Sequence, residues 1–144
     1  MYNLKSLINR IQVLHGNEYF SHNFYKKIIE NYTGDDWKKY IRINTTMYNR
    51  EKIFSDKRCS LWVMTWQPKQ QTNKHNHINT DCFFRVLNGE LQEYKPPQFY
   101  KSSILSKDKV YFVSGSDTHI LKNNSPLIVS SLHLYVNKEN EILY

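Results

Sequence analysis

The spacing of apolar positions predicts helices in the first forty residues. Apolar side chains recur three or four positions apart at Leu4, Leu7, Ile8, Ile11 and Leu14. This spacing is typical of an amphipathic helix, and His15-Gly16-Asn17 can end it. A second helix is predicted behind Ser21 as its N-cap, with an apolar stripe at Phe24, Ile28 and Ile29. After the break at 34–36, residues 37–41 are expected to form one short helical turn.

From about residue 48 the pattern changes to short runs of β-branched and aromatic residues between polar turns. The predicted strands cover 60–66, 82–87, 109–113 and 127–136, and 142–144 are expected to form an edge strand. Asn88-Gly89 predicts a two-residue hairpin, because both residues tolerate positive φ. Short strands of this kind predict a mainly β fold, an antiparallel sandwich or small barrel. We therefore expect one domain over 1–144, with 1–41 as a helical cover and 48–144 as the barrel.

Length and charge narrow the class of protein. The chain has 144 residues, which is the size of one domain, and a formal net charge of +7. Its basic residues occur singly or in pairs such as Lys26-Lys27. This scatter does not favour nucleic-acid binding as the main role. No apolar run is long enough to span a bilayer, so no membrane partner is expected.

Two cysteines, Cys59 and Cys82, are too few for a disulfide-rich secreted scaffold. The first residues, Met1 to Lys5, lack the apolar segment of a secretion signal. Both features favour the reducing cytoplasm, and we expect a monomer there.

Four of the six histidines lie in the strand-rich part: His75, His77, His119 and His133. His75-Asn76-His77 is an i, i+2 pair, and on a strand such a pair points both imidazoles to one face. Two converging imidazoles with a third from a later strand suit Fe, Zn, Cu or Ni. The alternative is a pair of solvated histidines in a polar loop.

The downstream spacing resembles the two motifs of the cupin superfamily. His75-x-His77, then Cys82 and Gly89, is similar to the first motif, with cysteine where a glutamate is usual. His119-x-x-x-Asn123 is similar to the end of the second. The chain departs from the family at Lys69, where cupins favour glycine. The resemblance implies a cupin-type antiparallel β-barrel, or jelly roll, whose inward histidines hold a metal.

A cysteine in the glutamate position resembles one cupin branch, cysteine dioxygenase. The similar segments are Thr65-Trp66, 75–83 and Ser131-Leu132-His133-Leu134-Tyr135, together with Tyr48-Asn49-Arg50 and Trp37. The resemblance implies a thioether bond between Cys82 and Tyr135 beside the iron. After Tyr135 the chain reads Val136-Asn137-Lys138 where the family continues Ser-Pro-Pro, so a C-terminus shorter than the family's is expected.

The resemblance also implies a role for each site residue. His75, His77 and His119 are the expected Fe(II) ligands; the alternative for His119 is a polar turn residue. Arg50, with Tyr48, is expected to bind the substrate carboxylate by two parallel hydrogen bonds, with Arg42 as its rival. Tyr135 is expected beside the iron, where its hydroxyl positions the reactants.

Two further residues have simpler alternatives. His133 is expected to hydrogen-bond the Tyr135 hydroxyl and orient it; otherwise it is a core histidine without a role. Cys82 has the alternative of a small buried residue, or of a disulfide with Cys59.

The expected function is oxidation of L-cysteine by O₂ to cysteine sulfinic acid at a non-haem iron. Three neutral imidazoles leave Fe(II) its full charge, which favours binding of an anionic thiolate. The alternatives are a dioxygenase for another small thiol or an N-terminal cysteine, and a metal-binding cupin without turnover. Arg50 distinguishes free cysteine from an N-terminal cysteine of a peptide, because only free cysteine has a carboxylate that needs it.

Overall fold

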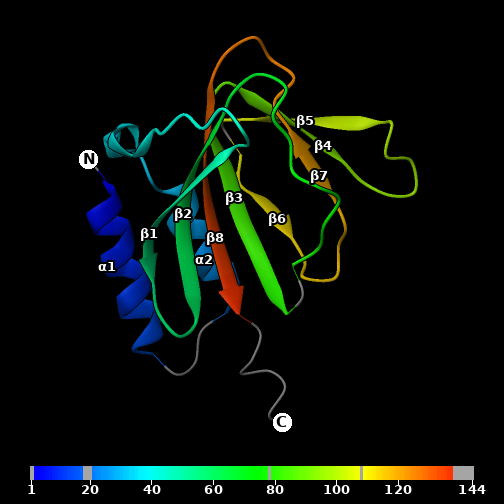
Figure 1. The fold of residues 1–144 in the computed structure, drawn as a ribbon. Coiled ribbons are helices and arrows are strands. Elements are labelled where there is room, and N and C mark those ends of the chain that lie inside the picture. Colours follow the sequence, from blue (N-terminus) through cyan, green and yellow to red (C-terminus); the bar gives the residue numbers. More distant parts are fainter. Residues whose placement is uncertain (1, 18–20, 78, 108, 138–144) are drawn as a thin grey trace.

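The computed structural model describes residues 2–17, 21–77, 79–107 and 109–137 and consists mainly of two antiparallel sheets (Figure 1). The larger sheet has the order β1 (Asn49–Ser55), β2 (Cys59–Trp66), β8 (Val129–Asn137), β3 (Thr80–Asn88) and β6 (Tyr111–Val113). The smaller has the order β5 (Ser102–Ser106), β4 (Glu90–Tyr94) and β7 (Ile120–Lys122). The mainly β prediction is confirmed, and the predicted edge strand at 142–144 lies outside the described residues.

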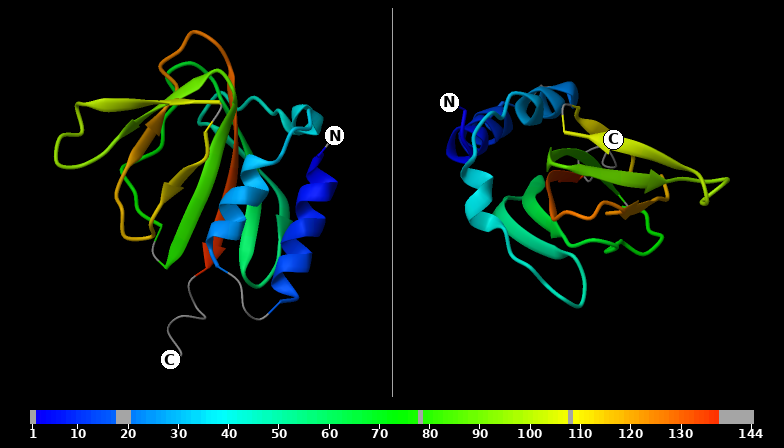
Figure 2. Two further views of the ribbon diagram at one scale, coloured as in Figure 1. Left: turned by 180° about the vertical axis from the view of Figure 1, so that it is seen from behind. Right: turned by 90° about the horizontal axis from the view of Figure 1, so that it is seen from above.

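The predicted helical segments are present and cover one side of the sheets (Figure 2). They are α1 (Leu4–His15), α2 (Asn23–Glu30) and the 3₁₀ turn η1 (Asp36–Tyr40). Asn3 caps α1 by accepting a hydrogen bond from the Ser6 N–H at 2.9 Å. Arg85 on β3 donates to the carbonyls of Ile29 and Tyr32 at the end of α2, at 3.0 and 2.7 Å. The Arg85 hydrogen bonds hold the end of α2 on the sheet.

Two details of the second helix differ from the prediction. Its N-cap is His22, which makes no side-chain capping bond, and the Ser21 hydroxyl instead accepts from the Asn23 N–H. Phe24 is exposed, whereas Tyr25 is buried beside Ile28 and Ile29. A short helix contacts the sheet over a narrow stripe, and the phenol of Tyr25 has a polar partner there, described below.

The larger sheet separates two apolar clusters. One lies between this sheet and the helices and includes Leu7, Ile29 and Leu134. The other lies on the opposite face and includes Trp66, Phe84 and Leu121. Residues along β2, β3 and β8 therefore alternate between the two clusters, as the two-residue period of a strand requires.

Asn88-Gly89 does not make the predicted hairpin. Gly89 has a φ of +74°, as expected of a turn glycine, but β3 and β4 on either side of it belong to different sheets. The turn is a corner at which the chain passes from the larger sheet to the smaller. A Cβ at Gly89 would lie 3.0 Å from Val129 Cγ2, so the corner packs directly on the start of β8.

Within the described part of the chain, none of the helices has both the length and the apolar character needed to cross a membrane.

Candidate metal centre

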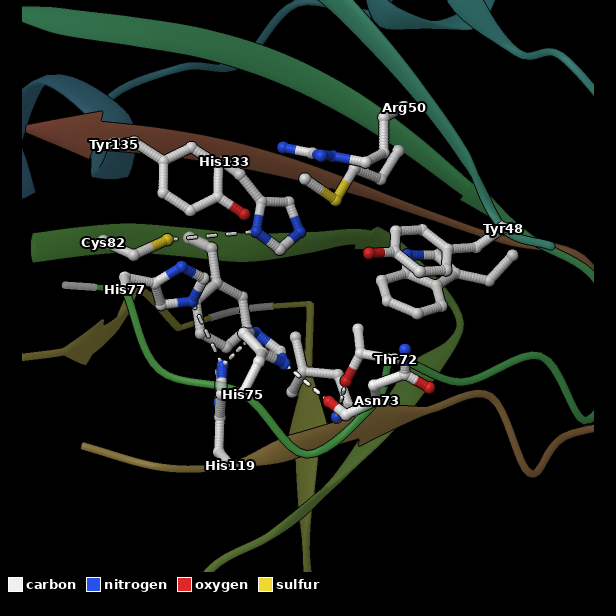
Figure 3. A pocket seen from close by; sticks show the side chains of 14 residues that line it. Tyr48, Arg50, Thr72, Asn73, His75, His77, Cys82, His119, His133 and Tyr135 are labelled. Atoms are coloured by element: carbon white, nitrogen blue, oxygen red, sulfur yellow. Dashed lines mark hydrogen bonds between the residues drawn. The ribbon is translucent and has the colours of Figure 1, made fainter. Parts of the chain in front are cut away.

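A cavity of about 260 Å³ opens between the two sheets, and side chains from both line it (Figure 3). The volume lies just below the ~300–1,000 Å³ typical of pockets for drug-sized ligands, so the cavity suits a molecule of amino-acid size. The lining includes eight residues singled out from the sequence: Tyr48, Arg50, His75, His77, Cys82, His119, His133 and Tyr135.

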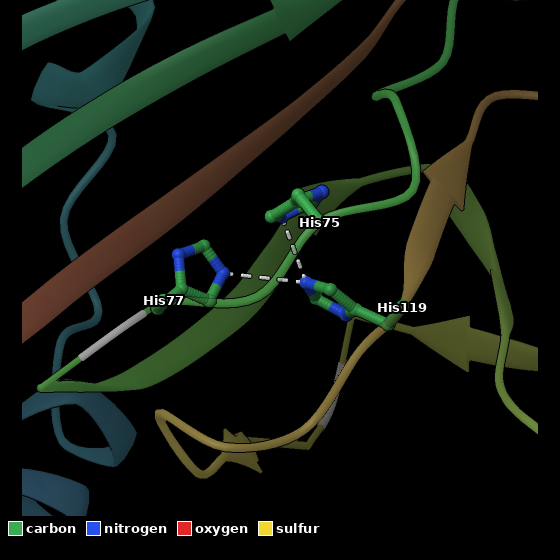
Figure 4. A group of neighbouring side chains, drawn as sticks. All are labelled: His75, His77 and His119. Atoms are coloured by element: carbon green, nitrogen blue, oxygen red, sulfur yellow. Dashed lines mark hydrogen bonds between the residues drawn. The ribbon is translucent and has the colours of Figure 1, made fainter.

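His75, His77 and His119 converge in this cavity (Figure 4). The Nε2 atom of His119 lies 3.0 Å from Nε2 of His75 and 3.3 Å from Nε2 of His77. Ligand nitrogens about 2.0–2.1 Å from one metal ion stand about 3.0–3.4 Å apart, at octahedral to tetrahedral angles. The two separations from His119 therefore fit one shared metal ion, and the three ligand atoms all lie within 4.8 Å of one another.

Two of these imidazoles are held through their other nitrogen. His75 Nδ1 lies 2.7 Å from the carbonyl oxygen of Asn73, and His119 Nδ1 lies 2.9 Å from a carboxylate oxygen of Glu93. A carbonyl and a carboxylate oxygen accept, so each Nδ1 carries a proton, and in the neutral ring Nε2 then presents a lone pair. Lone pairs facing each other at 3.0 Å favour a cation between them.

Burial also keeps the imidazoles of His75 and His77 neutral. It lowers the pKa of His77 to about 4, with smaller contributions from His75, His119 and Arg50. The pKa of His75 is lowered for the same main reason. A neutral imidazole is the form that binds metals, so these two side chains are in the metal-binding form at neutral pH.

The His75–His77 segment is an extended loop between β2 and β3, outside the strands that the sequence predicted. His75 forms an isolated antiparallel bridge with His119, through backbone hydrogen bonds of 3.1 and 2.9 Å. Gly115 packs against the same loop, where a Cβ would lie 2.7 Å from the carbonyl oxygen of His77. A larger residue at Gly115 would therefore displace the loop that carries two of the three imidazoles.

Asn123 and Lys69, two other positions of the cupin pattern, support the loops from outside the cavity. Asn123 is fully buried, and its side-chain amide donates to the carbonyls of Trp66 and Leu127. Lys69 donates its N–H to the Asn123 carbonyl and has a φ of +70°. This left-handed conformation is the physical reason for a glycine preference at the Lys69 position.

Cys82 and Tyr135 face each other across neighbouring strands. They are direct partners in the antiparallel register of β3 and β8, and both line the cavity. Burial raises the pKa of both groups above their ordinary values, with a smaller contribution to Tyr135 from Cys82. Cys59 is also a free thiol, but it belongs to the cluster beneath the helices. A disulfide between Cys59 and Cys82 would have to cross the sheet.

His133 does not make the expected hydrogen bond to Tyr135. Its Nε2 lies 2.8 Å from the Ser131 hydroxyl, and its Nδ1 lies 3.9 Å from the sulfur of Cys82. The Ser131 hydroxyl also accepts from the indole N–H of Trp66 at 2.9 Å. The His133 and Tyr135 rings are nearly parallel instead, with centroids 6.1 Å apart, because residues two apart on one strand face stand side by side.

Arg50 reaches the cavity and Arg42 does not line it. Arg50 stacks over the Trp62 ring, with Cζ 4.6 Å from the centroid. Burial raises the pKa of Tyr48, and the charge of Arg50 partly offsets this rise. Tyr48 stacks on Trp66 at 4.3 Å between ring centroids. Arg42 instead donates to the carbonyls of Lys39 and Ile41. The geometry thus favours Arg50 over its rival.

Glu93 was missed by the sequence analysis. Its carboxylate is buried between His119, at 2.9 Å, and the Lys95 ammonium, at 3.5 Å. The only sequence signal is the alternation of Leu91 and Glu93 on β4, which places both side chains on the inner face.

Comparisons with known proteins agree with this geometry. A family model described as cysteine dioxygenase type I matches residues 3–141. The curated cysteine dioxygenase type 1 of Homo sapiens is 27% identical over 124 residues, which are 75% of this chain and 61% of the human one. That of Danio rerio is 23% identical over 149 residues, covering 92% and 73%. The chain thus spans about three fifths of the human relative's length.

Solved structures agree on the fold. A Thermus thermophilus protein superposes with a TM-score of 0.64 at 19% identity, covering 72% of this chain and 96% of its own. A Klebsiella pneumoniae protein with a double-stranded β-helix domain gives 0.64 at 14% identity, covering 85% and 91%. The cupin domain of Schizosaccharomyces pombe Cnp3 gives 0.62 at 12% identity, covering 72% and 74%. The cupin-type β-barrel prediction is confirmed.

Proposed function

Because this chain belongs to the cysteine dioxygenase type I family, we propose that it is an iron-dependent thiol dioxygenase that oxidises L-cysteine to cysteine sulfinic acid. One observation carries the proposal: three imidazole Nε2 atoms converge in the cavity that also holds the paired Cys82 and Tyr135. In the reaction, both atoms of one O₂ molecule are added to the sulfur of one thiol.

His75, His77 and His119 would hold Fe(II), and the donor set fits this metal. All three donors are imidazole nitrogens, and within the described residues the grouping contains no carboxylate or thiolate ligand. When bound, iron supplies the one-electron chemistry that lets O₂ react with a thiolate. Glu93 and the Asn73 carbonyl would hold His119 and His75 so that their lone pairs point at the ion.

Arg50 would bind the carboxylate of the substrate. Its guanidinium lies on the cavity wall, and stacking on Trp62 restricts its position. Two parallel N–H···O hydrogen bonds would fix the carboxylate and so direct the thiol toward the histidines. Tyr48, held by Trp66 at the same wall, would shape this end of the cavity.

Tyr135 and His133 would act from the β8 side. The Tyr135 hydroxyl points into the cavity in Figure 3, where it can hydrogen-bond a reactant. His133 would act as a positioning residue, because Ser131 holds its ring and its other nitrogen faces the Cys82 sulfur. Burial lowers the pKa of His133 well below its ordinary value, so its ring is neutral.

The proposal includes a thioether between the Cys82 sulfur and the Tyr135 ring. One S–H and one ring C–H bond are replaced by a C–S bond, and the two hydrogens leave as two protons and two electrons to O₂. Their position as direct cross-strand partners supports it. After turnover with iron and cysteine, intact mass should fall by the mass of two hydrogens and remain lowered under reductant. A loss of mass that reductant reverses, or no loss in an active sample, would contradict the thioether.

The enzyme is proposed to be a cytoplasmic monomer with residues 1–144 as one domain. Both cysteines are free thiols, as a reducing compartment favours. The two apolar clusters share the larger sheet, which favours a single folding unit.

The test combines metal content, oxygen consumption and product identity. Protein loaded anaerobically should bind about one iron per chain and form sulfinate from cysteine in step with O₂ consumption. His119→Ala should lose both properties. Asn76→Ala is the matched control, because Asn76 lies between two proposed ligands with its side chain exposed.

Other outcomes would reassign the site. Iron binding with oxidation of cysteamine but not cysteine would favour another small thiol as substrate. Iron binding without oxidation of cysteine, cysteamine or a peptide with N-terminal cysteine would favour a metal-binding cupin. Unchanged iron content in His119→Ala would remove the proposed centre.

A further inference from the structure

A second group of metal-binding side chains lies on the other face of the larger sheet. His15 ends α1, Asp56 lies in the turn between β1 and β2, and Cys59 begins β2. The candidate ligand atoms of these residues lie within 4.8 Å of one another, although His15 and Asp56 are 41 positions apart. The cluster sits beside the apolar core under the helices, away from the cavity that holds the three imidazoles.

The carboxylate of Asp56 is oriented by its own turn. Its Oδ1 atom accepts from the N–H groups of Arg58 and Cys59 at 2.8 and 2.9 Å. This leaves Oδ2 directed at His15 Nδ1, 2.5 Å away, a hydrogen-bond contact that must open to about 3 Å when both atoms bind one ion. Burial opposes ionisation of Asp56, but these hydrogen bonds and that from His15 outweigh it and lower the pKa of the carboxyl. One fixed, anionic oxygen thus faces the imidazole.

The imidazole of His15 is held from its far side. Its Nε2 lies 2.7 Å from the hydroxyl of Tyr25 on α2, a buried side chain. A metal-binding histidine is usually oriented in this way, by donating its second N–H to an oxygen. In the metal-free protein Nδ1–H donates to Asp56; once an ion displaces that proton to Nε2, facing Tyr25, Nδ1 would present a lone pair toward Asp56 and Cys59.

We propose that His15 Nδ1, Asp56 Oδ2 and Cys59 Sγ bind one zinc ion, with water as a fourth ligand. Nitrogen, oxygen and sulfur donors together suit this borderline-soft cation, and three protein ligands leave one position open. The side chain of Asp56 is 30% exposed, which gives the ion a route from solvent.

Charge and protons balance at this site. The ion binds with loss of one proton from the Cys59 thiol, so the two positive charges are offset by one carboxylate and one thiolate. His15 stays neutral and moves its proton from Nδ1 to Nε2. Because the bound group has no net charge, the nearby Arg58 does not repel it. Burial, followed by Asp56, raises the pKa of the Cys59 thiol, so affinity should rise with pH as proton release becomes easier.

The proposed zinc site can be tested in a variant from which the cavity histidines His77 and His119 have been removed. Cobalt(II) is the probe, because a thiolate ligand gives it a near-ultraviolet charge-transfer band. The full chain carrying His77→Ala and His119→Ala should still bind about one Co²⁺ with this band, and Zn²⁺ should displace it. Adding Cys59→Ser should abolish the band, whereas Cys82→Ser is the matched control and should keep it.

A second variant guards against misfolding. The chain with His77→Ala and His119→Ala, here called the parent, should show a Zn²⁺-induced rise in thermal midpoint. Adding His15→Gln keeps a polar side chain at the end of α1 but should remove this rise. Its circular dichroism should match the parent's. Absence of a thiolate band in the parent would overturn the proposal and leave His15 and Asp56 as an ion pair. A band lost in Cys82→Ser and kept in Cys59→Ser would also overturn it.

Discussion

The two faces of strand β8 differ in kind although they are made by the same nine residues. Leu132, Leu134 and Val136 point into the cluster under the helices. Ser131, His133 and Tyr135 point the other way, and His133 and Tyr135 line the cavity. Both faces are largely removed from water: Leu134 is 0% exposed and His133 is 1% exposed.

The difference shows what burial costs on each face. Apolar side chains gain from leaving water, so the helix face stabilises the fold by area alone. Polar side chains must replace their lost water contacts, and His133 does so with Ser131, which in turn accepts from Trp66. Within β8, the helix-facing side chains should therefore contribute mainly to stability and the cavity-facing ones mainly to chemistry.

The largest expected effect is a stability loss on the helix face. Leu134→Ala removes a fully buried side chain and should lower the free energy of unfolding by about 2–5 kcal/mol in urea titrations. Iron content per folded molecule should not change. Tyr135→Phe on the opposite face is the control, with an expected loss below about 1 kcal/mol. Loss of iron binding in folded Leu134→Ala would show that the two faces are not separable.

The next effect belongs to substrate binding at the cavity face. Arg50→Ala should raise KM for cysteine by about 10- to 150-fold, the equivalent of about 1.5–3 kcal/mol for a charged hydrogen bond. Oxidation of cysteamine, which has no carboxylate, should change little. The same pattern in Arg42→Ala, with Arg50→Ala unaffected, would move the carboxylate site to Arg42.

The third effect is a loss of metal affinity on removing the charge of Glu93, which contacts His119. Glu93→Gln keeps the shape of the side chain but removes the charge beside His119, and should weaken metal binding by about 10- to 100-fold. Competition with a chromophoric chelator measures this affinity. Glu90→Gln is the control, since Glu90 is an exposed residue of the same strand. Equal affinities in both variants would make Glu93 a purely structural residue.

The smallest effect concerns pH. His133 is neutral when folded because burial lowers its pKa well below 6.5, whereas in the unfolded chain it takes up a proton below about pH 6.5. The unfolded state then binds more protons, so stability falls as pH falls from 6.5 toward the folded pKa. In metal-free protein, wild type should lose up to about 1.4 kcal/mol per pH unit more than His133→Gln. Parallel curves for the two proteins would contradict this.

The strands that the sequence revealed are those with two buried faces or one strongly apolar face. The predictions at 60–66, 82–87 and 127–136 match β2, β3 and β8, which lie inside the larger sheet. No strand was predicted at β1, β5 or β7, which lie at sheet edges; of the edge strands only β6 was predicted, by the run 109–113. Edge strands bury fewer side chains, so their apolar pattern is weak.

Strand pairing and polar contacts across the barrel could not be predicted from the sequence. Asn88-Gly89 fits a hairpin and a corner equally well, because the positive φ of Gly89 serves both, and the choice depends on distant partners. The three candidate metal ligands, His75, His77 and His119, were identified because their spacing resembles a motif. Glu93 contacts His119 from 26 positions away, and no local pattern marks such a pair.

The central place of β8 in the larger sheet has a consequence for synthesis. β2 and β3 are made first, but each needs β8 between them, since the strand order is β1-β2-β8-β3-β6. A growing chain therefore contains all three candidate metal ligands before β8, which lines the cavity behind them, has been made. Pairings of this long sequence separation form slowly, and the half-made sheet leaves two unpaired edges exposed. The ribosome-bound intermediate, and not the finished barrel, should be the form that needs a chaperone.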